Sequence, residues 1–271
     1  MADFDFLPVF QPGWVWLAGA GPGDPSLLTL GVHSALQQAD VVVHDALVGG
    51  DVLRFVRPGA LLDYAGKRGG RPSCRQDDIT AKLISLARAG KRVLRLKGGD
   101  PFMFGRGGEE ALALSRAGIP FRVLPGVTAG IGGLAYGGVP ATHRGINAAV
   151  TFLTGHGADG APPDDLDWGA IARGAPVLVI YMGVHHMAGI AERLIAGGRS
   201  PAEPVAVITD ASLPSQRVVE ATLATAAATI ATEAVRAPAM IVIGEVVRLR
   251  AELDWVGRFV TQAEQPLAQR A

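Results

Sequence analysis

The sequence predicts an α/β protein built from two α/β domains with a ligand cleft between them. Short apolar runs alternate with helical patterns along the chain, glycine-rich loops follow some of these runs, and the composition shifts around residues 140–150. Alternation of this kind is typical of strands in a sheet that is covered by helices. Loops at the carboxyl ends of parallel strands are where open α/β sheets bind ligands.

The first half has the clearest alternation and predicts parallel β/α/β units. Strands are expected at residues 14–19, 40–43, 61–64, 92–97 and 121–124, and helices at residues 26–38, 77–89 and 108–117. Asp24 before Pro25 is typical of a helix N-cap followed by the proline favoured at the first helical position. The loop GPGD is therefore expected to turn a strand into a helix.

The second half predicts another α/β domain. Strands are expected at residues 151–154, 177–182, 205–209 and 240–244, and helices at residues 185–196 and 217–233. The proposed domains cover residues 13–145 and 146–256, joined near Thr142 to Ala149, and a cleft between domains is a common place for a ligand. The two ends of the chain, residues 1–11 and 257–271, are expected to be frayed.

One uncharged stretch, Val123 to Thr142, is about as long as a membrane span. It contains six glycines and two prolines, so its apolar area is small. A tightly packed buried helix is the better interpretation, and no membrane segment is expected.

Composition limits the class of partner. Lys plus Arg and Asp plus Glu both total 25, so zero net charge gives no general attraction to nucleic acid or anionic membrane. A nucleic-acid methyltransferase should show a basic face with stacking aromatics, and aromatics make up only 6%. Residues 1–145 hold 16 basic and 12 acidic residues (net +4), which leaves 9 and 13 (net −4) for the remainder, so an anionic ligand should prefer the first half.

The cellular compartment is expected to be the cytoplasm. Cys74 is the single cysteine, which excludes an intramolecular disulfide and is typical of a reducing compartment. The first residues carry Asp3 and Asp5 and lack the basic and apolar regions of a signal peptide.

Several common cofactor motifs are absent or broken. GAGPGD resembles the start of a dinucleotide fingerprint, but Asp24 occupies its third glycine position and would repel a pyrophosphate. No glycine turn is followed by Gly-Lys-Ser/Thr, so nucleotide triphosphate hydrolysis is not expected. The histidines do not show the i, i+4 spacing with a carboxylate that a zinc site would need, so no metal is expected.

Two features point to chemistry in the first half. Asp45 follows the apolar run VVVH, where a carboxylate is unfavourable unless it has a task or a partner, although an Asp that caps the next turn would look the same. His44 is expected to orient that carboxylate. Lys67, Arg68, Arg71 and Arg75 lie among flexible glycines, which suits a ligand with several carboxylates or phosphates, or else a solvated loop.

A family resemblance adds to this reading. The segments GAGPGDPSLLTL, VVVHDALV, AGKRGG, RLKGGDPFMFGRGGEE and VLPGVTAGIGGLAYGGVPATHR, in that order, resemble the uroporphyrinogen-III C-methyltransferases of the tetrapyrrole methyltransferase family. The resemblance covers about residues 14–255. PGDP and GGDP occur across the wider family, whereas AGKRGG, GRGGEE and the glycine-rich stretch ending in PATHR are typical of the uroporphyrinogen enzymes.

The resemblance implies a homodimer that binds S-adenosylmethionine between its two domains, uses no metal and releases S-adenosylhomocysteine. It also implies transfer of two methyl groups, to C2 and C7 of uroporphyrinogen III, which gives precorrin-2 through precorrin-1 for cobalamin or sirohaem synthesis. The implied donor contacts are Pro22, Gly98, Gly99, Asp100, Met103, Thr128, Ala129, Met182, Ala211 and Ala239. Relatives often have a branched aliphatic residue at the position of Met103.

The resemblance also implies catalytic roles. Asp45 would be the base that accepts a proton from the methylated ring, and Lys67 its acidic counterpart or simply a partner for a substrate acetate or propionate. Because uroporphyrinogen carries eight carboxylates, we assign Arg68, Arg71, Arg106 and Arg144 to substrate binding. The alternatives are a methyltransferase of a later precorrin, which would share the donor loops but lack AGKRGG and PATHR, and a non-catalytic tetrapyrrole-binding module.

Overall fold

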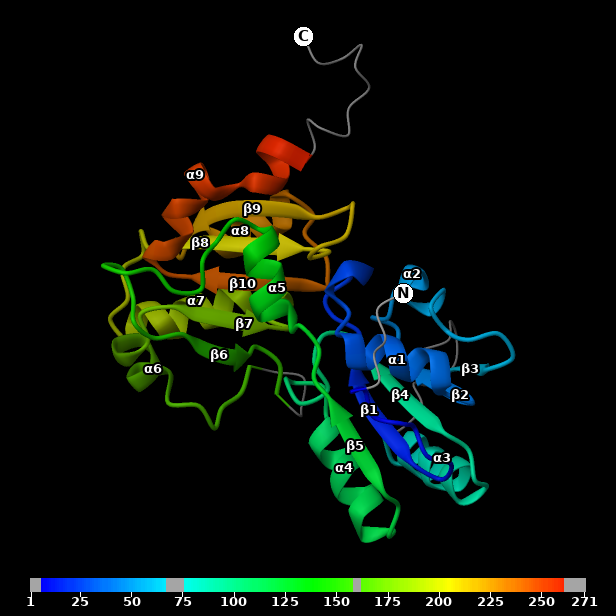
Figure 1. The fold of residues 1–271 in the computed structure, drawn as a ribbon. Helices are drawn as coiled ribbons and strands as arrows, with labels where there is room; N and C mark the ends of the chain where they lie inside the picture. Colours follow the sequence, from blue (N-terminus) through cyan, green and yellow to red (C-terminus); the bar gives the residue numbers. More distant parts are fainter. Residues whose placement is uncertain (1–5, 67–75, 158–161, 261–271) are drawn as a thin grey trace. The chain divides into compact units, whose positions relative to one another are not determined.

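The computed structural model describes residues 6–66, 76–157 and 162–260 (Figure 1). Lys67, Arg68, Arg71 and Cys74 lie outside these ranges. The chain divides into two compact units, Met1–Thr128 and Ala129–Ala271.

The first unit contains a five-stranded parallel sheet in the order β3-β2-β4-β1-β5. Its strands are β1 (Val15–Gly19), β2 (Val41–His44), β3 (Leu61–Tyr64), β4 (Val93–Lys97) and β5 (Phe121–Leu124). The predicted parallel β/α/β units are therefore confirmed, with strand ends within one residue of those expected. All five strands end at the same edge of the sheet, because parallel strands share one direction.

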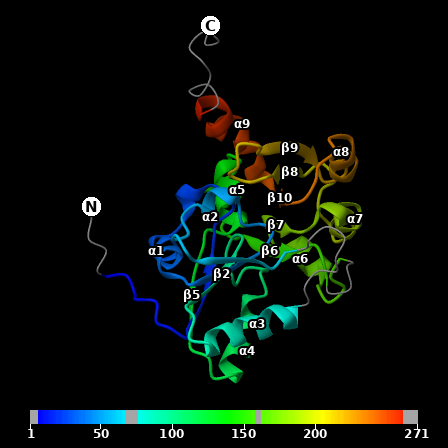
Figure 2. The same ribbon diagram turned by 90° about the vertical axis from the view of Figure 1, so that its right-hand side faces the viewer.

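Helices cover both faces of this sheet. They are η1 (Pro25–Leu27), α1 (Leu30–Gln38), α2 (Gly50–Leu53), α3 (Gln76–Arg88) and α4 (Gly107–Arg116). Trp16, Leu94 and Leu96 pack with α1 on one face, whereas Leu17 and Val93 pack with α3 and α4 on the other. Figures 1 and 2 both show α3 beside α4.

The turn after β1 forms as predicted, with one difference. The Asp24 side chain accepts a hydrogen bond from the backbone N–H of Ser26 at 2.7 Å, and Pro25 occupies the first position of the turn. This turn is the short 3-10 helix η1, so the expected single helix from residue 26 is interrupted. The helix α1 begins only at Leu30, where Thr29 provides a second cap to Val32.

The second unit contains a mixed five-stranded sheet in the order β6-β7-β10-β8-β9. Its strands are β6 (Thr151–Thr154), β7 (Leu178–Tyr181), β8 (Pro204–Thr209), β9 (Arg217–Thr222) and β10 (Ala239–Ile243). Only β6 and β7 run parallel; the other neighbours are antiparallel.

One face of the second sheet carries most of the buried core. The helical elements of the second unit are α5 (Ala129–Tyr136), α6 (Trp168–Gly174), η2 (Val184–His186), α7 (Met187–Ala196), α8 (Ala226–Thr232), η3 (Glu245–Leu249), α9 (Arg250–Leu253) and η4 (Val256–Val260). Side chains of α6, α7 and α8 pack with Ile180, Val207 and Ile241 in this core. The glycine-rich helix α5 packs against β7 and β10.

One expectation in this half needs correction. The helix expected over residues 217–233 is wrong, because Arg217–Thr222 forms the edge strand β9 and only Ala226–Thr232 is helical. The β-branched valines and threonine among the polar residues of RVVEAT suit an edge strand beside β8. The uncharged stretch from Val123 contains the end of β5 and the eight-residue α5, and no helix in the described ranges is long and apolar enough to cross a membrane.

The sequence placed the domain boundary at residues 145/146, after the glycine-rich helix. In the structure the division falls at Thr128/Ala129, because α5 packs on the sheet of the second unit. Gly133 lies on the face of α5 that packs on this sheet. A Cβ added at Gly133 would lie 2.9 Å from the Ala211 Cβ. The change in composition follows this helix and does not mark the change of unit.

Candidate functional site

Three glycine loops meet at the carboxyl edge of the first sheet. Gly21 and Gly99 exchange backbone hydrogen bonds of 3.1 and 2.7 Å, and the Ala20 N–H donates to the Lys97 carbonyl at 2.7 Å. The loop after β1 is thus hydrogen-bonded to the loop after β4. Pro22, an expected donor contact, directly follows this bridge and is half-buried.

Glycine is required where these loops touch. A Cβ added at Gly126, after β5, would lie 2.6 Å from the Gly19 carbonyl oxygen, and it would also collide with the Gly99 carbonyl. Gly99 has a φ of +66°, in the region that favours glycine. The glycines of these loops therefore serve close backbone packing and a turn, which leaves the loop surface free of side-chain bulk.

Asp100 ties two of these loops together. Its Oδ1 accepts from the Phe102 N–H at 2.8 Å and its Oδ2 accepts from the Gly126 N–H at 3.0 Å. The family resemblance implied that Asp100 contacts the donor. In the structure both oxygens already accept backbone hydrogen bonds, so Asp100 fixes the loop whose backbone would form the site.

Asp45 lies at the same edge, after β2, with 26% of its side chain exposed. Its Oδ1 accepts from the Leu47 N–H at 3.1 Å and faces the Gly98 N–H at 3.4 Å. Asp45 therefore caps the turn after β2, which was one of the two roles that the sequence left open. It also reaches the loop expected to hold the donor. The expectation for His44 is wrong: its Nδ1 faces the backbone carbonyl of Asp45 at 3.3 Å, not the carboxylate.

The two described candidates for substrate carboxylates differ in their surroundings. Arg106 is more than half exposed and forms a two-point ion pair with Glu109, with nitrogen–oxygen distances of 2.9 and 2.6 Å. This hydrogen bonding raises the pKa of Arg106 and lowers that of Glu109. Arg144 is exposed in the turn closed by His143 and Asn147, and it forms no salt bridge within the described ranges.

In the second unit, strand register brings the expected donor contacts of this unit to one sheet edge. β10 pairs antiparallel with both neighbours, Met240 opposite Tyr181 and Ala239 opposite Thr209. Met182 follows Tyr181 and Ala211 lies just after Thr209, so both lie near Ala239. Ala129 joins them, because the next N–H of α5, that of Gly130, donates to the Tyr181 hydroxyl at 2.9 Å.

This second edge is apolar and conformationally unusual. Met182 has a φ of +56° and is 48% exposed, so a flexible apolar side chain is presented on a constrained backbone. Asp210 and Ser212, on either side of Ala211, also have positive φ. Small alanines beside an exposed methionine leave room for a flat apolar group.

Comparisons with known proteins identify the family of this chain. Residues 15–227 match the family model described as tetrapyrrole (corrin/porphyrin) methylases. The chain belongs to this family. It combines two α/β units, as the solved members of the family do. One of these is a uroporphyrin-III C-methyltransferase from Thermus thermophilus in complex with S-adenosyl homocysteine. It is 42% identical to this chain, and the match covers 87% of this chain and 99% of that one with a TM-score of 0.74.

Relatives with curated names point the same way. A uroporphyrinogen-III C-methyltransferase from a Sinorhizobium species is 59% identical over 98% of this chain and 96% of its own length. Siroheme synthase 1 of Yersinia enterocolitica is 50% identical over 94% of this chain, and the match spans 53% of that protein. This tetrapyrrole methylase chain thus spans about half the length of the siroheme synthase. A solved cobalt precorrin-4 methyltransferase shares the fold, with a TM-score of 0.77 and 27% identity over 87% of this chain and 96% of that one.

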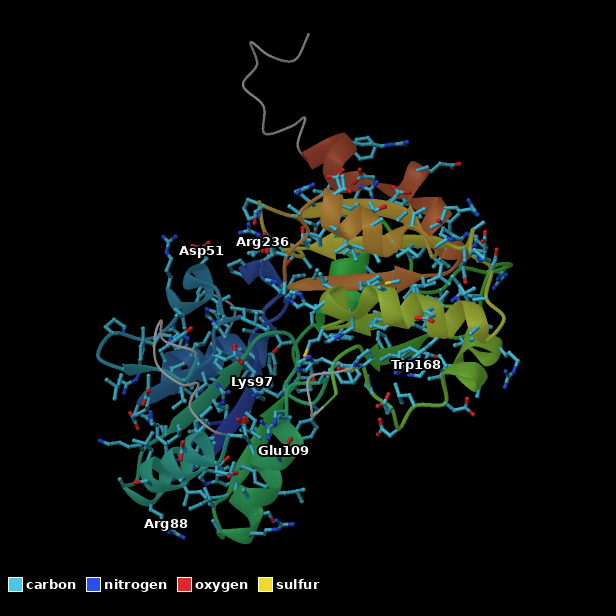
Figure 3. All side chains as sticks on the ribbon, turned by 180° about the vertical axis from the view of Figure 1, so that it is seen from behind. Asp51, Arg88, Lys97, Glu109, Trp168 and Arg236 are labelled. Atoms are coloured by element: carbon cyan, nitrogen blue, oxygen red, sulfur yellow. The ribbon has the colours of Figure 1, made fainter. Side chains whose placement is uncertain are left out.

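A group of buried charges in this methylase escaped sequence reasoning. Arg95 and Lys97 of β4 and Glu110 of α4, here called the buried charge cluster, are each less than 6% exposed at the side chain. Glu110 Oε1 lies 3.1 Å from Arg95 Nε and 3.5 Å from Lys97 Nζ. Figure 3 labels Lys97 in this region and also Glu109, the neighbour of Glu110 on α4.

The alternation of β4 explains this cluster. Val93, Arg95 and Lys97 share one face of the strand, which is the face covered by α3 and α4. That face is apolar at its amino end and charged at its carboxyl end. The signal was present in the sequence: two cations at i and i+2 in an otherwise apolar strand, with an acid in the first turn of the next helix.

Burial perturbs the lysine of the cluster. Desolvation lowers the pKa of Lys97, with a further lowering from Arg95, and Glu110 and Asp45 oppose this shift. Glu110 is fully buried, and its Oε1 also accepts from Gln76 at 2.7 Å, while its Oε2 has no hydrogen-bond partner within the described ranges. The cluster lies close to Asp45. The register of β2 and β4 pairs Arg95 with Val43, which is two residues before Asp45.

Proposed function

We propose that this chain catalyses S-adenosylmethionine-dependent C-methylation of uroporphyrinogen III at C2 and C7, giving precorrin-2 through precorrin-1. One observation carries the proposal: the Asp45 carboxylate accepts from the Gly98 N–H at 3.4 Å, so a candidate base lies against the glycine loop expected to hold the donor. The 59% identity to a uroporphyrinogen-III C-methyltransferase across nearly the whole chain supports the substrate. The product can serve cobalamin or sirohaem synthesis.

The residues at the two sheet edges suit S-adenosylmethionine. In the first unit, we assign Pro22, Gly98, Gly99, Met103 and Thr128 to donor contacts, with Asp100 holding the loop in shape. In the second, Met182 and the small Ala129, Ala211 and Ala239 offer an apolar surface to the adenosine. The donor supplies a methyl group on a sulfonium, which is intrinsically reactive, so the protein needs only to position it and exclude water.

Asp45 is the proton acceptor in this proposal. When a pyrrole carbon accepts the methyl group, its ring becomes cationic. The ring then loses a proton from the neighbouring bridge carbon and becomes neutral again. A carboxylate within hydrogen-bond reach can accept that proton. The hydrogen bonds to Oδ1 hold Asp45 in one orientation, and its exposed fraction gives a substrate access to the carboxylate. Lys67, outside the described residues, is proposed as its acidic counterpart or as a partner of a substrate carboxylate.

Cations complete the substrate site. We assign Arg68, Arg71, Arg106 and Arg144 to the acetates and propionates of the tetrapyrrole. Of these, Arg106 is already paired with Glu109. A substrate carboxylate must therefore share or replace that partner, which makes Glu109 a competitor for the same guanidinium.

We also propose that the protein acts as a homodimer in the cytoplasm. The sequence family implies this association, and the subunit mass is 28.1 kDa. Sedimentation equilibrium at micromolar concentration is expected to give twice the subunit mass. A single-subunit mass across that range would contradict the proposed dimer and leave the methyl transfer untouched.

Anaerobic turnover with a radiolabelled donor tests the proposed reaction. The protein is incubated with methyl-labelled S-adenosylmethionine and either uroporphyrinogen III or a later, already methylated precorrin. We expect label in the tetrapyrrole with uroporphyrinogen III as acceptor. Label only with the later precorrin would replace the proposed substrate, and tetrapyrrole binding without any transfer would indicate a non-catalytic module.

A further inference from the structure

We infer that Arg95 is a positioning residue for Asp45, and that Glu110 is the buried counter-ion that holds Arg95 in place. This inference rests on the proposed role of Asp45 as the proton acceptor. It assigns a task to the buried charge cluster, none of whose members is exposed enough to serve as a main substrate contact.

The orientation of Arg95 is fully determined by its neighbours. Its Nε donates to Glu110 Oε1 at 3.1 Å, and its Nη1 donates to the carbonyls of Val43 and Leu96, both at 3.3 Å. A guanidinium is planar, so fixing two of its nitrogens fixes the third. The third nitrogen, Nη2, lies 4.0 Å from Asp45 Oδ2.

The two oxygens of Asp45 therefore face different partners. Oδ1 faces the N–H groups of Leu47 and Gly98, whereas Oδ2 faces the Arg95 guanidinium. Backbone on one side and a buried cation on the other restrict rotation of the carboxylate. Proton transfer depends on such alignment, since small displacements of a reacting group lower the rate strongly.

Glu110 gives Arg95 its fixed position. The Glu110 side chain is completely buried and interacts with both cations of the cluster and with Gln76. Replacing a buried ion pair by apolar residues of similar volume is often neutral or stabilising, so fold stability alone gives a weak account of this arrangement. Orientation of the partly exposed Asp45 carboxylate beside the cluster accounts for it directly.

A double-mutant cycle tests the inference. Arg95→Lys keeps the charge but loses the planar fork, so kcat should fall about 10- to 100-fold while the KM values for donor and tetrapyrrole change less than about twofold. In an Asp45→Asn background the same substitution should change kcat less than about twofold, because the carboxylate that Arg95 positions is already gone. Circular dichroism and thermal unfolding check that each variant folds.

Arg92→Lys is the matched control. It makes the same substitution just before the amino end of β4, in an ion pair with Asp40, and should lower the unfolding temperature without changing kcat. If Arg95→Lys does not fold, Glu110→Gln replaces it in the cycle, since it keeps the side-chain shape and predicts the same non-additivity with Asp45→Asn.

Two outcomes would overturn different claims. If Asp45→Asn is slow but the effects of Arg95→Lys and Asp45→Asn multiply, Arg95 does not act through Asp45 and the inference fails. If Asp45→Asn turns over at the wild-type rate, the proposed base itself is wrong, whatever Arg95 does.

Discussion

At the carboxyl end of β2, Asp45 serves both the local turn and the chemistry assigned to it. The sequence left these two roles as alternatives, and the structure shows that the hydrogen bond to Leu47 and the contact with Gly98 are made by the same oxygen, Oδ1. The sequence could point to Asp45 because an acid after a buried strand is unusual. It could not show the Arg95 guanidinium beside it, because only the register of β2 and β4 places the two together.

Asp45→Asn separates the two roles. The amide oxygen can still accept the backbone hydrogen bonds, so the fold should be retained, but an amide cannot accept the proton. We expect kcat to fall about 10²- to 10⁴-fold, with the affinity for S-adenosylhomocysteine unchanged. Steady-state kinetics and calorimetric titration measure both quantities, and a large loss of ligand affinity would instead assign Asp45 to donor binding.

Arg106 and Glu109 predict a pair of opposite effects. Arg106→Ala should raise the KM for the tetrapyrrole about two- to fivefold and leave the KM for the donor unchanged. An exposed ion pair contributes up to about 1 kcal/mol, which corresponds to a factor of this size. Glu109→Gln removes the competing carboxylate and should lower the tetrapyrrole KM. Arg116→Ala, at the other end of the same helix α4, is the control. Unchanged tetrapyrrole KM values in both test variants would show that this guanidinium does not meet the substrate.

Among the elements, the central strands of the first sheet were readily predictable because they are buried on both faces. β1, β2 and β4 are buried throughout, which gives the short apolar runs seen in the sequence. β9 was missed because its mixed polar and apolar residues do not alternate and are followed within a few residues by the alanine-rich α8, so the joined stretch looks like one helix. The four-residue α2 and the seven-residue α6 are too short to give a periodic pattern.

Asp40 ties the starts of β2 and β4 together and predicts a pH-dependent contribution to stability. It bonds to Arg92 at 2.7 Å and to Arg57 at 2.6 Å, and hydrogen bonding to Arg92 holds the pKa of Asp40 well below its usual range. A carboxyl whose pKa is lower when folded stabilises the fold above its unfolded pKa of about 3.9, and this contribution is lost as the pH falls toward the folded value.

Asp40→Asn should therefore lower the free energy of unfolding by about 1–3 kcal/mol at pH 7. The difference from wild type should shrink as the pH falls below about 4. Urea unfolding at several pH values measures it. Asp51→Asn is the control: Asp51, labelled in Figure 3, forms an exposed pair with Arg54, so its substitution should change the free energy of unfolding little. A pH-independent difference for Asp40→Asn would show that its charge is not responsible.

The packed glycines give a prediction for the loops as elements. Gly126→Ala places a Cβ against the backbone of Gly19 and Gly99, so the loops must separate. We expect a loss of about 1–3 kcal/mol in unfolding free energy and weaker binding of S-adenosylhomocysteine. Gly108→Ala, in the first turn of α4 with no neighbouring atom within 4 Å, should leave both unchanged or slightly improve stability. Equal ligand affinity in the two variants would contradict the role given to the loop.

For the whole molecule, the two units each present one group of the expected residues at a sheet edge. The sequence could predict both groups because glycines and small residues at strand ends form recognisable motifs, and the family resemblance connected them to one ligand. The buried charge cluster was missed although its residue types are visible in the sequence, because the two cations of β4 meet Glu110 only where α4 covers that strand. The proposed catalytic site therefore combines a donor loop, the base Asp45 and the cation Arg95 that positions it.

Mass analysis of the product tests this assignment most directly. Wild-type protein and Asp45→Asn are each incubated anaerobically with uroporphyrinogen III and isotopically labelled S-adenosylmethionine, and the labelled methyl groups on each tetrapyrrole are counted. We expect two labelled methyl groups per ring for the wild type and very little labelled product for Asp45→Asn over the same time. Unlabelled tetrapyrrole from wild-type protein that binds the donor, or two methyl groups added equally fast by Asp45→Asn, would contradict it.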